Sequence, residues 1–195
     1  MSCPVCDNPS FDLILNQPTT TLWTNAPDGV FESPGTHPCV LRQCQACRHV
    51  YQPLSPPLKT LLQNIYESKF SVGSTPKGVG NYGEYMASHC LKNMGILSPK
   101  KPQSVLEIGC SDGYFLDVFK KLGFSRVVGI DPCIAKDHEK DGVFLVRGYV
   151  TDRTELNESF DLIFSTDVLE HVEDVNAMLG FCQKHLTPAG RLSIS

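Results

Sequence analysis

The second half of the chain alternates short apolar segments with amphipathic ones, and no other feature limits its possible folds as strongly. The apolar segments have the length of buried strands and read SVLEIG, RVVGID, VFLVRG, FDLIFS and RLSIS. Apolar residues at helical spacing mark YFLDVFKKLG and a segment from about Val175 to Leu186. Strands joined by helices predict right-handed crossovers and a parallel sheet covered on both faces. We therefore expect residues 101–195 to form an α/β domain.

Composition indicates a globular protein and argues against two classes of partner. Of the 195 residues, 41% are hydrophobic and 19% are charged, which allows a buried core. The net charge of −4 does not provide the positive field that attracts nucleic acids or anionic membranes. The sequence has no run of 18 apolar residues, and its first ten residues lack the basic and apolar regions of an export signal. We expect a cytoplasmic protein with neither nucleic acid nor membrane as its partner.

Two C-x2-C pairs stand in the first 57 residues and predict a metal site. The four thiols belong to Cys3, Cys6, Cys44 and Cys47. A two-residue gap lets a tight turn aim both thiolates at one ion, and four thiolates complete the tetrahedral shell that zinc prefers. This lobe is rich in proline and has little periodicity, so metal binding would replace a missing core. With four protein ligands the zinc would be structural.

Other interpretations of this lobe stay open at the level of sequence. Cys39 and His49 lie near the second pair, and either of them could replace a ligand. The cysteines could also be free or form a redox pair. A zinc ribbon can bind nucleic acid, but residues 1–57 carry only two cations, Arg42 and Arg48, against four acids.

A helical linker is predicted over residues 58–100. The first helix begins at Pro57 and ends near Phe70, because Leu58, Leu61, Leu62, Ile65 and Tyr66 recur at helical spacing. After a loop rich in glycine, a second helix runs from Tyr82 to about Leu97.

A ligand cradle is predicted where the first strand of the α/β domain ends. The absence of a β-carbon at Gly109 lets a ligand approach the backbone, and Gly113 turns the chain tightly into a helix with free N–H groups. The next strand ends on Asp131, where a carboxylate can accept hydrogen bonds from both hydroxyl groups of a ribose. Open α/β sheets bind their ligands at this edge.

The residues of the cradle also distinguish between nucleotide cofactors. A dinucleotide fingerprint needs glycine at two positions that are Ser111 and Tyr114 in this chain. Glu107 would place a negative charge near any pyrophosphate, whereas the same charge favours the cationic sulfonium and amino groups of S-adenosylmethionine. The sequence therefore predicts S-adenosylmethionine as the cofactor.

Residues 104–195 resemble class I S-adenosylmethionine-dependent methyltransferases, whose core is a Rossmann-like parallel sheet. The resemblance is carried by EIGCSDG, GIDP and FDLIFSTDVLEHV. It implies the following roles by position: Gly109, Cys110, Ser111 and Gly113 line the methionine moiety, Asp131 holds the ribose, Arg147 to Val150 with Tyr149 border the adenine, and Thr166 and Asp167 flank the methyl group.

The cysteine-paired lobe ahead of such a core is similar to sugar C-methyltransferases, which act on nucleotide-linked deoxysugars. Their aromatic-rich segment between the lobes is matched by Tyr66, Phe70 and Ser74, whereas the histidine that follows it there has no clear counterpart here. We take Tyr66 of this segment as one candidate catalytic residue. His171 is the other, because an imidazole titrates near neutral pH. The alternatives are that Tyr66 packs in a core and that His171, with Glu170, caps a helix.

The function expected from these patterns is methyl transfer to a carbon or oxygen of a small acceptor such as a nucleotide-linked sugar. A non-catalytic module that binds zinc and cofactor is one alternative, and a nicotinamide-dependent oxidoreductase is another. The resembling family has seven strands in its sheet and this sequence predicts five, so we expect the α/β core to be incomplete after Ser195. The sequence does not identify the base that a carbon acceptor would need.

Overall fold

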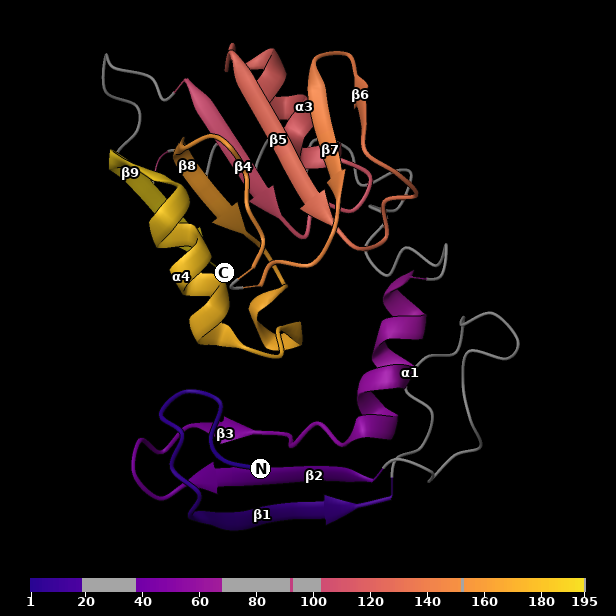
Figure 1. The fold of residues 1–195 in the computed structure, drawn as a ribbon, viewed down its shortest axis with the longest axis vertical. Helices are drawn as coiled ribbons and strands as arrows, with labels where there is room; N and C mark the ends of the chain where they lie inside the picture. The colour runs from indigo at the N-terminus through magenta and orange to yellow at the C-terminus, as the bar shows by residue number, and fades with distance from the viewer. Residues whose placement is uncertain (19–37, 68–91, 93–102, 152, 195) are drawn as a thin grey trace. The chain divides into compact units, whose positions relative to one another are not determined.

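A computed structural model describes residues 1–18, 38–67, 92, 103–151 and 153–194 (Figure 1). It divides into two compact units, and each is described here by itself. Unit 1 comprises Met1–Phe70 and Glu173–Asn176, and unit 2 comprises Ser71–Val172 and Ala177–Ser195. The predicted second helix of the linker lies outside the described residues except for Lys92.

Unit 1 contains a small antiparallel sheet followed by a helix. The strands, in the order β1-β2-β3, are β1 (Phe11–Gln17), β2 (Cys39–Cys44) and β3 (Val50–Tyr51). The sequence did not predict these strands, because their side chains are exposed or half-buried apart from Cys44 and Tyr51 and show no strict alternation. The only core cluster of the described part of this unit consists of Cys3, Cys44 and Tyr51.

The first linker helix is present as α1 (Pro56–Glu67), one residue earlier than predicted. Ser55 caps it, since its hydroxyl accepts the N–H of Leu58 at 3.4 Å and its carbonyl accepts the N–H of Lys59 at 2.9 Å. Proline is tolerated in the first turn, where a helix leaves its N–H groups unpaired.

Unit 2 is built on one six-stranded sheet in the order β6-β7-β5-β4-β8-β9. Its strands are β4 (Ser104–Ile108), β5 (Arg126–Asp131), β6 (His138–Lys140), β7 (Val143–Arg147), β8 (Phe160–Ser165) and β9 (Leu186–Ile194). All neighbours are parallel except β6 and β7. The predicted parallel sheet is therefore confirmed. The exposed, polar edge strand β6 was not predicted, because its sequence HEK carries no apolar signal.

Helices cover both faces of this sheet, as the alternation of segments predicts. The helices are α3 (Tyr114–Lys121) and α4 (Val175–His185), with a short 3-10 helix η1 (Leu169–His171) between β8 and α4. On β4, Val105 packs in the cluster with Phe119 of α3, and its neighbour Leu106 packs in the cluster with Met178 of α4. Consecutive residues of a strand thus face opposite layers.

Strand β9 begins earlier than predicted and contains an irregularity. Leu186 pairs with Phe160, but the next pair joins Leu162 to Arg191, so several residues of β9 bulge out. A β-carbon on Gly190 would lie 2.8 Å from the carbonyl oxygen of Phe160, which explains the glycine at this close approach.

The strand order places a switch point between β4 and β8. From β4 the chain adds β5 and β7 on one side, and it then returns to add β8 and β9 on the other side (Figure 1). Loops that leave adjacent strands in opposite directions open a crevice at their carboxyl ends, where α/β sheets bind ligands. No helix in the described parts of the chain is long and apolar enough to span a membrane.

Candidate cofactor site and cysteine cluster

The turn after β4 has the backbone conformation that its glycines predict. Gly109 and Gly113 have φ angles of 79° and 84°, and the N–H of Gly113 donates to the carbonyl of Cys110 at 2.8 Å. A β-carbon on Gly109 would lie 2.2 Å from Cγ2 of Val168, so no other residue fits there without movement. Ser111 also has a positive φ, of 50°, although it is not glycine. Such strain concentrates at functional sites.

Asp131, the last residue of β5, holds this turn in place. One oxygen of its carboxylate, Oδ2, accepts the backbone N–H of Ser111 at 2.8 Å. The other, Oδ1, accepts the N–H of Cys133 at 2.7 Å. Each oxygen has a second lone pair, so the carboxylate keeps the capacity to accept hydrogen bonds from a ligand. Its side chain is largely buried, and 8% of the residue surface is exposed.

Glu107 is buried on β4, two residues before Gly109. Only 2% of its surface is exposed, and its Oε2 has no hydrogen-bond partner among the described residues. Burial raises the pKa of its carboxyl well above the usual range, and the negative charges of Asp131 and Asp112 add to this effect. The site thus contains three acids and favours a positively charged ligand.

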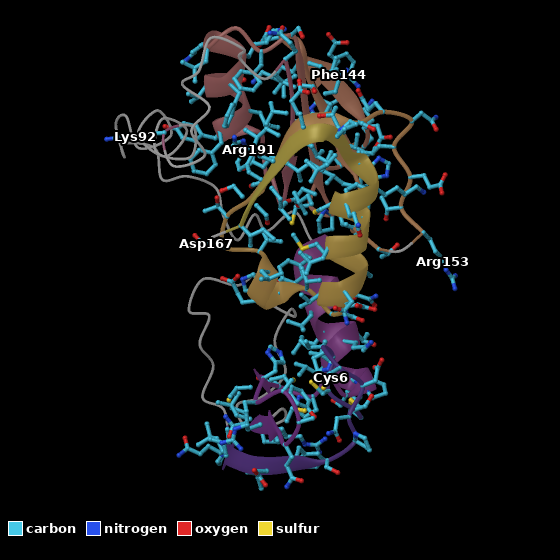
Figure 2. The ribbon with its side chains drawn as sticks, turned by 90° about the vertical axis from the view of Figure 1, so that its left-hand side faces the viewer. Cys6, Lys92, Phe144, Arg153, Asp167 and Arg191 are labelled. Atoms are coloured by element: carbon cyan, nitrogen blue, oxygen red, sulfur yellow. The ribbon has the colours of Figure 1, made fainter. Side chains whose placement is uncertain are left out.

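The end of β8 contributes polar groups on the other side of β4. Asp167 has a positive φ of 55° as the chain leaves this strand, and Figure 2 labels its position. Ser165 is 1% exposed, and its hydroxyl has no hydrogen-bond partner among the described residues. Sequence reasoning selected Thr166 and Asp167 but missed Ser165. The available signal was a polar residue at the end of the apolar segment FDLIFS.

The predicted cofactor residues fall into three places in unit 2. The first is the turn after β4, with Glu107, Gly109, Cys110, Ser111 and Gly113. Asp131 joins this turn through its hydrogen bond to Ser111. Thr166 and Asp167 follow β8, which pairs with β4, so these two places share one edge of the sheet. Tyr149 follows β7 and is 39% exposed.

The two candidate catalytic residues, His171 and Tyr66, belong to different units. His171 ends η1, and its Nε2 lies 4.0 Å from Oε1 of Glu170, beyond hydrogen-bonding distance. Glu170 therefore does not form a hydrogen bond with the imidazole of His171. Tyr66 belongs to α1 in unit 1.

The four cysteines of the two C-x2-C pairs converge in unit 1. Their sulfur atoms all lie within 4.8 Å of one another, and Figure 2 shows sulfur atoms gathered at Cys6. The Sγ atoms of Cys3 and Cys47 are 3.6 Å apart, as are those of Cys6 and Cys44. Sulfur ligands about 2.3 Å from a tetrahedral zinc ion lie about 3.8 Å from one another, so this donor set fits zinc.

The two C-x2-C pairs lie on turns that share one backbone hydrogen-bond pattern. The residues that follow the pairs, Asp7 and Arg48, have positive φ angles of 56° and 65°, and their N–H groups donate to the carbonyls of Cys3 and Cys44. Backbone N–H groups of Cys47 and Ala46 lower the pKa of Cys44 to about 6 against the opposing effect of its burial. The turn at Cys44 therefore favours a thiolate. At Cys6 the lowering effect of the backbone N–H of Asn8 is outweighed by the neighbouring thiols and by burial, which raise the pKa of Cys6 to about 12.

The two alternative ligands are not part of this cluster. His49 stacks on Tyr51 with a ring distance of 6.1 Å, and Cys39 begins β2 opposite Gln17. Cys110, Cys133 and Cys182 lie in unit 2, where burial raises the pKa of each thiol. These three cysteines are therefore protonated at neutral pH and poor nucleophiles.

Comparison with known proteins places the second half of the chain among methyltransferases. A sequence profile described as "Methyltransferase domain" matches residues 82–195. "Ubiquinone biosynthesis O-methyltransferase" of Bradyrhizobium sp. (strain ORS 278) is 37% identical over 98 residues, which are 47% of this chain and 38% of that protein. The protein of the same name from Paramagnetospirillum magneticum is 31% identical over 113 residues, or 54% and 45% of the two chains. The chain thus matches less than half the length of these relatives.

Solved structures of methyltransferases share the fold. The plantazolicin methyltransferase BpumL superposes with a TM-score of 0.51 at 17% identity, covering 72% of this chain and 53% of its own. CalS10 from Micromonospora echinaspora, an amino pentose methyltransferase, gives a TM-score of 0.51 at 22% identity, covering 60% of this chain and 52% of its own.

Proposed function

The chain belongs to the methyltransferase domain family, and from this premise we propose that it binds S-adenosylmethionine at the carboxyl ends of β4, β5 and β8 and transfers the methyl group to a small acceptor. The observation that carries the proposal is the acidic cradle formed by the glycine turn, Asp131 and the buried Glu107. The three acids around this turn disfavour the pyrophosphate of a dinucleotide and favour a cationic ligand.

Each part of the cradle has a distinct role in this proposal. The open backbone from Gly109 to Gly113 holds the methionine moiety, and Asp131 accepts hydrogen bonds from the ribose hydroxyls. Tyr149, after β7, borders the adenine, and Thr166 and Asp167 flank the methyl group. Asp167, which follows β8, is exposed and has a positive φ. Its side chain is therefore accessible to an acceptor at this edge of the sheet.

Catalysis in this arrangement comes chiefly from positioning. When bound, the cofactor would supply an electrophilic methyl group, whose bond to sulfur would break as the acceptor atom bonds to its carbon in line with that bond, with a neutral thioether as the leaving group. The chain holds the acceptor along that line and excludes water from it. Tyr66 and His171 remain the side chains proposed to act on the acceptor, and a carbon acceptor requires a base for its proton.

We propose a nucleotide-linked sugar as the acceptor, methylated at carbon or oxygen. The support is the paired-cysteine lobe together with the fold shared with CalS10, which is an amino pentose methyltransferase. The ubiquinone O-methyltransferase relatives support oxygen as the atom that is methylated.

Zinc in unit 1 is a further part of the proposal. Cys3, Cys6, Cys44 and Cys47 would hold one ion with no open coordination position, so its role is structural. The proposed organisation is a zinc lobe over residues 1–57, a helical linker over 58–100 and a cofactor-binding domain over 101–195. The single small core cluster described in unit 1 supports a need for the metal.

Transfer of a labelled methyl group tests the proposed activity. The protein is incubated with S-adenosylmethionine labelled in its methyl group and with nucleotide-linked sugars or phenols as acceptors. We expect a labelled product from the sugar nucleotides, and less of it with Asp131→Ala at a cofactor concentration that does not saturate the variant. Cofactor binding without transfer to any acceptor would overturn the enzymatic assignment and favour a binding module.

A further inference from the structure

Glu107 is a buried acid, and the charged groups that act on it among the described residues are negative. The residue is 2% exposed, and its Oε2 has no hydrogen-bond partner in the described parts of the chain. An unpaired carboxylate in such a place loses its hydration without compensation, which strongly disfavours the ionised form.

Among the described residues, the groups around Glu107 are acids, a thiol and apolar side chains. In the sheet it pairs with Gly129 on β5 and with Phe164 on β8. The charged groups that act on it are Asp131, at the end of β5, and Asp112, in the turn after β4. The thiol of Cys110 lies in the same turn and is itself affected by the charge of Glu107. From α3, Leu116 and Phe119 pack in the adjoining core cluster.

The two buried acids of the cradle differ in their hydrogen bonds. Both oxygens of Asp131 accept backbone N–H groups, an arrangement that suits an ionised carboxylate. Glu107 has an orphaned oxygen instead, and two neighbouring carboxylates in one site do not both ionise easily. Burial, the orphaned oxygen and the neighbouring acids therefore favour the protonated form of Glu107.

We propose that Glu107 carries a proton in the cofactor-free protein and releases it to solvent when the cationic cofactor binds. The proposal rests on the cofactor assignment made above. In the exchange the O–H bond of the Glu107 carboxyl breaks, the proton passes to solvent or buffer, and the resulting carboxylate balances the positive charge of the bound ligand. The raised pKa of Glu107 agrees with this arrangement.

Proton release makes cofactor affinity depend on pH in a definite direction. While Glu107 is protonated in the free protein and ionised in the complex, the affinity rises about tenfold for each unit of pH. Above the pKa of Glu107 in the free protein the dependence ends, because no proton remains to be released.

Calorimetry in several buffers measures this release directly. S-adenosylmethionine is titrated into the 195-residue protein at about pH 6 in buffers of different ionisation enthalpy, and the slope of the binding enthalpy gives the number of protons released. We expect about one proton for the wild type and none for Glu107→Gln. Asp117→Asn is the matched control, since Asp117 is an exposed acid of α3 that does not act on Glu107, and it should release as many protons as the wild type.

A second variant keeps the test decisive if Glu107→Gln does not fold. Asp112→Asn removes one like charge while its side-chain oxygen can still accept the N–H of Tyr114, so it should lower the pKa of Glu107 and reduce the release at the same pH. Tight binding without proton release at any pH would overturn this proposal and leave the cofactor assignment intact. Absence of binding at every pH would overturn the cofactor assignment itself.

Discussion

The Oδ2 atom of Asp131 accepts the backbone N–H of Ser111 at 2.8 Å and so ties the end of β5 to the turn after β4. One carboxylate therefore shapes the turn and remains available to a ribose. Replacing Asp131 with alanine should weaken S-adenosylmethionine binding by about 1–3 kcal/mol, the range for polar groups left unpaired. This corresponds to a loss of affinity of about 5- to 150-fold, which calorimetry can measure.

Asp141→Asn is the matched control for this variant. Asp141 is exposed before β7 and has a φ of 53°, a conformation that asparagine tolerates. It should bind the cofactor as the wild type does. Unchanged affinity in Asp131→Ala would remove Asp131 from the ribose role.

Gly109→Ala tests the close approach of the β4 turn to the segment after β8. The new β-carbon would lie 2.2 Å from Cγ2 of Val168 at a φ of 79°. We expect the free energy of unfolding to fall by about 2–5 kcal/mol, from backbone strain and overpacking together. Gly123→Ala has the same kind of φ, at 90°, but nothing within 4 Å, so it should lose only about 1–2 kcal/mol.

The double variant Gly109→Ala, Val168→Ala separates the two causes. Shortening Val168 removes the contact and leaves the strain, so denaturant unfolding should show partial recovery relative to Gly109→Ala alone. A double variant that is no more stable than the sum of its two single losses would contradict the packing described between these residues.

One zinc ion per chain is expected in protein purified without added metal. Cys44→Ser should abolish zinc binding and unfold unit 1 before unit 2, because unit 1 has only a three-residue core cluster among its described residues. Cys39→Ser should retain the ion, since Cys39 lies outside the sulfur cluster. Native mass spectrometry measures both. A folded unit 1 without zinc would contradict the structural role.

Acid should destabilise unit 2 partly through Asp161, at the start of β8. Burial opposes ionisation there, but hydrogen bonds from Gln103, Ser104 and Thr187 prevail and lower the pKa of its carboxyl. A lowered pKa stabilises the folded protein above the ordinary pKa of an aspartate and loses this contribution as the pH falls through the lowered value. Asp161→Asn should therefore cost about 1–3 kcal/mol at neutral pH and less at a pH below the ordinary pKa of an aspartate. An equal loss at both pH values would contradict this account.

Much of unit 2 could be predicted from the sequence because it is buried. The segments VLEI and VVGI are largely apolar and buried on both faces, as in strands of a covered parallel sheet, and the glycines of the β4 turn are required by positive φ angles. Strand β6 and the bulge of β9 gave no such signal. Both depend on backbone pairing with a neighbouring strand, and their residues are mostly exposed.

The candidate site likewise contains residues that the sequence predicted and residues that it did not. The spacing of Cys3, Cys6, Cys44 and Cys47 was sufficient to predict a four-sulfur cluster, because ligand spacing is a local property. That Ser165 Oγ and Glu107 Oε2 have no hydrogen-bond partner among the described residues depends on what surrounds each side chain in three dimensions. The sequence alone therefore indicated a charge at position 107 but not its protonation.

Equilibrium binding of the two alternative cofactors tests the central claim, the identity of the cofactor, most directly. S-adenosylmethionine and a nicotinamide dinucleotide are titrated separately into the 195-residue protein in a calorimeter. The acidic cradle predicts saturable binding of one S-adenosylmethionine per chain, weakened by Asp131→Ala, and no measurable binding of the dinucleotide. Saturable binding of the dinucleotide, with none of S-adenosylmethionine, would contradict the account.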